Sequence, residues 1–270
     1  MSELEKLSVV IRYEFLKHIR RKRLYIILAI ALVAEALVLI LIPALMHHYP
    51  SDVKVMAALL TIGASMAALG AVFFAGDAIA GEYEGKTGFL LFTNPINRET
   101  LWIGKYIASF IAVALLMIFT YIIMAVALLV IYRQVPSEIF QSFGMAMYYA
   151  AAVLSVTFLF SAISRGSMGA TIMSLVFVWV ICDILESVLA FTSNPYWFVL
   201  KAGADSIAMS YGSMSSFIAG LGGVSNSGHG ADMLSILKTP SLGMAAFGLT
   251  IYFVGGLVGS IYLSRRRQLS

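Results

Sequence analysis

A polar stretch between two long apolar runs reads Asp77-AIAGEYEGKTGFLLFTNPINRETLWIG-Lys105. Three carboxylates open it, at Asp77, Glu82 and Glu84, and an apolar patch over residues 89–92 lies in its middle. A simple connector between membrane helices gains nothing from apolar side chains held in water, so the patch predicts a partner that covers it. The neighbouring charges would set the register of that partner.

Residues 80–87 fit a loose phosphate-loop pattern, because four residues precede Gly85-Lys86-Thr87. The stricter glycine-first form fails, since Gly81 lies one position too close. Glu82 and Glu84 would also occupy a loop that must cradle phosphate with bare amides. The preceding segment has the character of a membrane helix rather than a strand, so we expect no nucleotide site in this chain.

The composition predicts a polytopic membrane protein. Of the 270 residues, 60% are hydrophobic and 12% are charged, and the mean hydropathy is +0.91. Those values exclude an ordinary soluble domain. The single cysteine lies in an apolar run, which gives neither a disulfide framework nor metal-ligand spacing. We expect no cleavable signal peptide, because the chain stays polar through Arg23 and the next run is long enough to span.

Six apolar segments are long enough to cross a bilayer, for which about 20 residues are needed. They lie at 24–46, 55–80, 101–132, 140–163, 168–191 and 242–263. The expected fold is therefore an all-α integral membrane protein with one transmembrane domain over residues 1–270. The third segment is longer than a bilayer needs, so its ends must tilt or project.

An amphipathic helix precedes the first span, within residues 3–22. Apolar residues recur there at helical spacing between charged ones, which is typical of a helix in the cytoplasmic membrane interface. The alternative is a solvated leader that only carries charge. The cluster Arg20, Arg21, Lys22 and Arg23 then stands directly before the first span, as an orientation signal and a site for anionic lipid head groups. We expect no nucleic-acid partner for a cluster held against a membrane.

The distribution of basic residues predicts the topology. With the amino terminus inside, the cytoplasmic segments hold thirteen lysines and arginines, and the external segments hold four. Both termini and the segment 81–100 are then cytoplasmic, in a multi-pass protein of the plasma membrane. Residues 192–241 form an external connection that is too apolar for a free linker, so we expect short re-entrant helices around 197–221.

Three carboxylates fall inside predicted spans, at Glu35, Asp183 and Glu186. Such groups are costly in a bilayer and usually face a cavity, a partner or a conduction path. Asp183 and Glu186 are three apart and share a helix face, so they line a translocation path or a cation site, or are simply hydrated near the outer interface. Glu35 lines the same path or makes a structural hydrogen bond between helices. We find no catalytic arrangement, and adjacent His47-His48 is not a metal-chelating pattern.

These features together resemble the type-2 ABC transporter permease family. The likeness rests on the amphipathic helix, the six spans and a short motif of acidic residues, an apolar patch, proline and arginine that leads into the third span. The matching residues are Glu82, Glu84, Thr87, Phe89, Leu90, Leu91, Phe92, Pro95, Arg98, Gly104 and Lys105. Lys86 departs from the pattern, because the family often has glycine before the threonine.

The resemblance implies a permease subunit of an ATP-driven exporter that pairs with a second copy or a paralogue. ATP and magnesium would bind separate ABC ATPase subunits, so this chain is not itself an enzyme and holds no cofactor. The segment 81–100 would be the coupling segment that docks on the ATPase, with the patch as its anchor. One competing class is a stand-alone proton- or cation-coupled carrier or channel that uses Asp183 and Glu186. Another is a membrane scaffold without transport.

Overall fold

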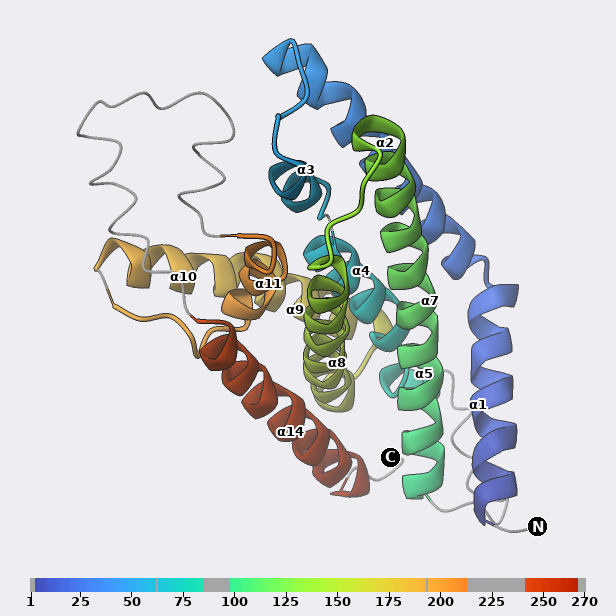
Figure 1. Cartoon of the computed structure of the whole chain (residues 1–270). Coiled ribbons are helices and arrows are strands. Elements are labelled where there is room, and N and C mark those ends of the chain that lie inside the picture. The colour runs from blue at the N-terminus through green and yellow to red at the C-terminus, as the bar shows by residue number, and fades with distance from the viewer. Residues whose placement is uncertain (1–2, 62, 85–97, 193, 213–240, 267–270) are drawn as a thin grey trace.

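A computed structural model describes residues 3–61, 63–84, 98–192, 194–212 and 241–266, and these residues form helices and connecting turns with no strand among them. This agrees with the predicted all-α class. Figure 1 shows the arrangement. The helices are α1 (Glu3–Arg20), α2 (Arg23–Met46), α3 (Val53–Leu60), α4 (Gly63–Ala75), α5 (Ala80–Glu84), α7 (Arg98–Tyr132), α8 (Ile139–Ile163), α9 (Ser167–Val176), the π-helical η1 (Phe177–Ile181), α10 (Cys182–Phe191), α11 (Leu200–Met209) and α14 (Leu242–Arg266).

Within the described residues, five helical stretches are long and apolar enough to cross a membrane. They are Arg23–Met46, Glu99–Tyr132, Ile139–Ile163, Ser167–Phe191 and Leu242–Ser264, which match five of the six predicted spans. The predicted span 55–80 instead contains two shorter helices, α3 and α4. α3 stops at Thr61, whose ψ of 68° leaves the helical region and whose hydroxyl donates to the carbonyl of Ala57. The count of six single-helix spans is therefore not confirmed.

Helix α8 is the centre of the bundle, and α4, α7, α11 and α14 all pack against it. Small side chains on α8 allow these close approaches, as is usual where membrane helices meet. At the crossing with α14, a Cβ on Gly256 would lie 2.7 Å from the carbonyl carbon of Ser155. The two backbones are therefore in direct contact at that point.

Helix α1 lies beside the first half of α7 (Figure 1). Gly104 permits this packing, because a Cβ there would lie 2.5 Å from Cγ1 of Val10. α1 is joined to α2 at Lys22, which has a φ of 58° and breaks the helix between them. The predicted helix within 3–22 is present, and its position relative to a bilayer stays a prediction.

The bundle has two ends, called proximal and distal. The starts of α1 and α7 and the end of α14 lie at the proximal end (Figure 1). At the opposite, distal end the Tyr132 hydroxyl donates to the carbonyl of Pro50 at 2.6 Å. Ser142, near the start of α8, donates to the carbonyl of Ile207 in α11 at 3.0 Å, which places α11 distally. α11 is a short helix inside the predicted connection 192–241, whose residues 213–240 lie outside the described part.

Candidate functional site

The short helix α5 stands at the proximal end, immediately before residues 85–97, which lie outside the described part of the chain. The first amides of a helix have no partner within the helix itself. Here the backbone N–H groups of Ile79 and Ala80 both donate to Oγ of Ser161 at 3.0 Å. Because Ser161 belongs to α8, the central helix fixes where α5 begins.

A buried lysine joins α5 to two other helices. Nζ of Lys105, in α7, donates to Oε1 of Glu82 at 2.6 Å and to Oε1 of Glu14, in α1, at 2.8 Å. The Lys105 side chain is 3% exposed, and Lys17 lies 3.4 Å from Glu14 and 3.8 Å from Glu82. A buried ammonium without partners is strongly destabilising, so the two carboxylates are needed where they stand. The bridge ties α1, α5 and α7 together.

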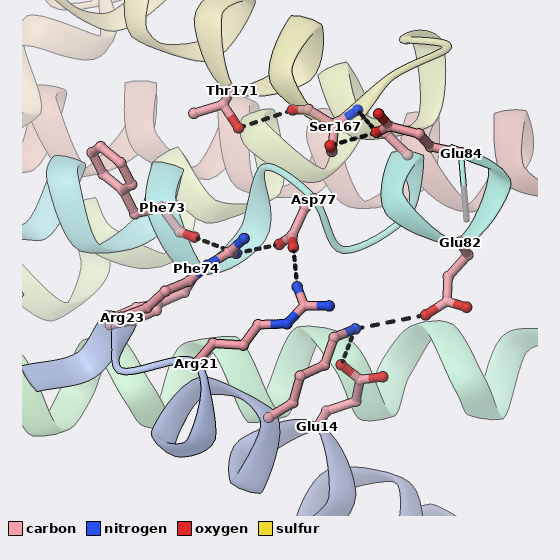
Figure 2. Close-up of polar contacts among 12 residues, drawn as sticks. Glu14, Arg21, Arg23, Phe73, Phe74, Asp77, Glu82, Glu84, Ser167 and Thr171 are labelled. Atoms are coloured by element: carbon pink, nitrogen blue, oxygen red, sulfur yellow. Dashed lines mark hydrogen bonds and ion pairs between the residues drawn. The ribbon is translucent and has the colours of Figure 1, made fainter. Parts of the chain in front are cut away.

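Asp77, in the turn between α4 and α5, forms ion pairs with two arginines at the break between α1 and α2. Its two oxygens lie 2.8 Å from Nη1 of Arg21 and 2.8 Å from Nη1 of Arg23 (Figure 2). Arg23 also donates to the carbonyl of Phe73 at 3.4 Å. The basic cluster thus supplies the counter-charge for Asp77, which lies just after the end of α4, where negative charge is unfavourable. Arg21 and Arg23 face the protein, and the predicted lipid contact of the whole cluster stays a prediction.

His18 fills the space between these two ion-pair groups. Its ring lies edge-on to Phe74 with 5.1 Å between the ring centroids, and its side chain is buried. Burial lowers the pKa of His18 to about 4, although Asp77 and Glu14 oppose that shift. The ring is therefore neutral at neutral pH, and α1 docks partly through an uncharged aromatic contact.

Glu84 reaches from the end of α5 to the start of α9 (Figure 2). Its Oε2 accepts from the backbone N–H of Ser167 at 2.8 Å and from the Ser167 hydroxyl at 2.5 Å. These two hydrogen bonds hold the pKa of Glu84 below its usual range. Glu84 is therefore ionised at neutral pH, at a helix start where negative charge is favourable.

The predicted coupling residues are thus described only in part. Glu82 and Glu84 make contacts within the chain, and Arg98 is the first residue of α7. The rest lie outside the described residues, namely Thr87, Phe89, Leu90, Leu91, Phe92 and Pro95. A docking role for the patch therefore stays a prediction, whereas the anchoring of the segment before it is visible.

A second polar cluster lies at the distal end, between α10 and α11. Oδ1 of Asp183 lies 3.1 Å from Nζ of Lys201, and the carboxyl groups of Glu186 and Asp205 are hydrogen-bonded to each other. The hydroxyl of Tyr196 donates to Asp205 at 3.4 Å. Burial and the charge of Glu186 raise the pKa of Asp205 to about 7. The predicted pair Asp183 and Glu186 is thus close together and bound to α11.

Glu35 lies in a different part of the bundle. Its helix, α2, packs mainly on α7, α1, α4 and α3, whereas α10 packs on η1 and α11. The Glu35 side chain is 1% exposed, and its Oε2 has no hydrogen-bond partner among the described residues. An ionised carboxylate in that position would be costly, so we treat Glu35 as neutral.

Five carboxylates of these contacts were predicted from the sequence, whereas most of their partners were not. Ser167, Lys201 and Asp205 were not predicted as site residues, and Glu14 and Lys105 were noted without a predicted contact. Lys105 carries a usable signal, since it is a lone charge near the start of an apolar run. Ser167 carries none, because serine is common in loops and caps. Within the described chain, no group of three or more histidine, cysteine or carboxylate side chains is arranged to hold a metal ion.

Comparison with known proteins gives one family match. Residues 10–181, well over half of the chain, match the family described as ABC-2 family transporter protein. No curated protein matches the chain. The matched range includes the Lys105 bridge, Asp77 with its arginines, and the contact of Glu84 with α9. The chain therefore belongs to the ABC-2 transporter family and is a multi-pass membrane permease of an ABC transporter.

Proposed function

We propose that this permease is the membrane subunit of an ATP-driven exporter and that segment 81–100 couples it to a separate ATPase subunit. The observation that carries the proposal is the anchoring of α5. Glu82 binds it to α7 and α1, Ser161 holds it to α8, and Glu84 binds it to α9. A force applied to residues 85–97 would reach four helices at once. That is the arrangement a coupling segment requires.

The ATPase is the proposed site of nucleotide chemistry. ATP and magnesium bind that partner, and this chain contributes the docking surface and the path. The patch Phe89–Phe92 supplies apolar anchors, and residues such as Arg98 supply alignment. The proximal end then faces the cytoplasm, with both termini, and α3 and α4 together make the sixth crossing of the plasma membrane.

The transport path is proposed to form between two permeases, as a dimer of this chain or with a paralogue. Asp183 and Glu186 lie near the external mouth of that path, where Lys201 balances part of their charge. Glu35 would approach the path only through movement of α2, since it is enclosed within one chain.

Arg20 and Lys22 are exposed and are proposed to contact anionic lipid head groups.

The test is release of the ATPase by a double substitution in the patch. Phe89→Ala with Phe92→Ala removes two central aromatic anchors, and losing about 2 kcal/mol or more lowers affinity at least thirtyfold. The matched control is Phe140→Ala with Phe191→Ala, which removes two exposed aromatics from α8 and α10. ATPase retention on permease-loaded resin and transport in reconstituted vesicles are measured together. Full retention and full transport by the patch variant would refute the docking role.

The carrier alternative makes the opposite forecast. A stand-alone carrier that uses Asp183 and Glu186 would transport without any ATPase, and the patch substitutions would have no effect. Transport by vesicles that contain the permease alone, driven by a proton gradient, would decide for it.

A further inference from the structure

The start of α9 is held by a residue that is distant in the sequence. Ser167 is the first residue of α9, and Gly166 precedes it with extended backbone angles and no side chain to offer. Ser164, the other nearby hydroxyl, donates to the carbonyl of Gly166 and does not cap the helix. Helix starts are usually capped by their own flanking residue. Here Glu84, 83 positions earlier, does so with two hydrogen bonds.

A second contact joins the same two segments one helical turn further on. A Cβ placed on Gly76 would lie 2.4 Å from Oγ1 of Thr171, so α9 touches the turn after α4 at that point. Thr171 in turn donates to the carbonyl of Ser167 at 3.0 Å. Figure 2 shows Ser167 and Thr171 above the stretch that carries Asp77 and Glu84. The start of α9 thus contacts both ends of residues 76–84, through Ser167 at Glu84 and through Thr171 at Gly76.

The helix that begins at Ser167 is otherwise weakly enclosed. In its most apolar stretch 17% of residues are buried within the chain, compared with 67% for α8. It continues through the π-helical η1 into α10, which carries Asp183 and Glu186 at the distal end. π-helical turns inside α-helices are frequent at functional positions. Apart from the packing of α9 on α8 and α4 and of α10 on α11, little within the chain opposes a displacement that passes from Ser167 to α10.

We infer that Glu84 is a positioning residue that links the coupling segment to α9 and so passes its movement to α10 and the external carboxylates. The inference rests on the proposed coupling function and names the route within the chain. Lys105 and Glu82 carry the movement to α7, and Glu84 carries it separately to α9. A charged acceptor suits this role, because hydrogen bonds to ionised groups are about twice as strong as neutral ones.

The experiment follows two helices at once in the assembled permease–ATPase complex. In a Cys182→Ser background, one spin label is placed at residue 187 on α10 and, in a second sample, at residue 122 on α7, both at exposed positions. The change in each spectrum on adding ATP with vanadate is measured. Glu84→Leu should reduce the change at residue 187 about tenfold or more, as expected for loss of a charged hydrogen bond. The change at residue 122 should persist.

A local cap separates this role from simple stabilisation of α9. Gly166→Asp supplies a capping carboxylate next to Ser167, at backbone angles that suit a cap. In the Glu84→Leu background it should restore thermal stability without restoring the change at residue 187. Glu84→Gln, which keeps an acceptor oxygen, should restore much of both. Glu138→Leu, at the start of α8, is the matched carboxylate control and should leave both labels responsive.

The outcomes distinguish the inference from the proposal beneath it. If neither label responds to nucleotide in the parent protein, the proposed coupling function fails. If both labels respond in Glu84→Leu as they do in the parent, the function stands and the Glu84 route is wrong. If Gly166→Asp restores the response at residue 187, Glu84 is only a cap, and the inference is overturned.

Discussion

The proximal and distal polar clusters differ in how their charges are balanced. At the proximal end Glu14, Asp77 and Glu82 are met by lysines and arginines from α1, α2 and α7. At the distal end Lys201 pairs with Asp183, while burial and the charge of Glu186 raise the pKa of Asp205. The proximal carboxylates are thus paired with cations, whereas the distal cluster contains a carboxyl group, Asp205, whose protonation changes near neutral pH. We conclude that the proximal cluster holds helices together through ion pairs, and that the charge of the distal cluster depends on pH.

The largest effect should come from breaking the proximal bridge. Lys105→Met removes the buried cation between Glu14 and Glu82 and leaves the more exposed Lys17 beside them. Removing one partner of a buried ion pair typically costs about 3–5 kcal/mol. Thermal unfolding in detergent is the measurement, with Lys201→Met as the distal control, since Lys201 is 32% exposed. Equal losses of stability in the two variants would remove the distinction between the clusters. Adding Glu14→Gln and Glu82→Gln to Lys105→Met should recover part of the loss.

A smaller effect is expected where water can replace the partner. Asp77→Asn weakens two arginine contacts, but Arg21 and Arg23 are 50% and 33% exposed. The cost should lie near 1.5 kcal/mol, the low end for hydrogen bonds to charged groups. Arg23→Gln should cost more than Arg21→Gln, because Arg23 also binds the carbonyl of Phe73. A larger loss of stability for Arg21→Gln than for Arg23→Gln, measured by the same unfolding assay, would contradict this account of the proximal cluster.

The distal cluster should make the free energy of unfolding depend on pH. The pKa of Asp205 is raised from 3.8 to about 7, so the folded protein holds this proton more tightly than the unfolded chain. Its stabilising contribution is full below pH 3.8 and is lost as pH rises through about 7. Between pH 6 and pH 8 the free energy of unfolding should fall by about 1.4 kcal/mol. Asp205→Asn should flatten that slope, and an unchanged slope would show that another group titrates.

The smallest effect should come from an exposed ion pair at the distal end. Lys54 binds Glu138, and both side chains are substantially solvated. Such pairs contribute about 0.2–1 kcal/mol, and salt screens them. Lys54→Ala should therefore change stability little, and less still at high salt. A loss comparable to that of Lys105→Met would mean that burial does not set the ranking.

Much of the fold could be predicted from the sequence because a bilayer imposes a length on every apolar run. The bounds of α2, α8 and α14 follow the predicted spans closely for that reason. The break between α3 and α4 was missed, since a threonine bonding to its own helix leaves no mark on hydropathy. The π-helical η1 was also missed, because its residues are as apolar as their neighbours.

The site was predictable in its residue types and less so in its contacts. That Asp77 needs arginine follows from its place at a helix end, where negative charge is unfavourable. The partners of Glu82 and Glu84 were not foreseen, because Lys105 and Ser167 are brought near them only by helix packing. Sequence spacing gives contacts within one helix, whereas these contacts join separate helices.

The long sequence separation of the Lys105 bridge bears on how the protein is made. A ribosome completes Glu14 well before Lys105, which comes 91 positions later, and Asp77 follows Arg21 by 56. Until α7 has entered the membrane, Glu14 therefore has Lys17 of its own helix beside it but lacks Lys105. A nascent chain that stalls before α7 would present α1 undocked to cellular quality control. Ribosome-stalled chains cut before and after Lys105 should differ in protease sensitivity at α1, which makes its docking a late checkpoint of assembly.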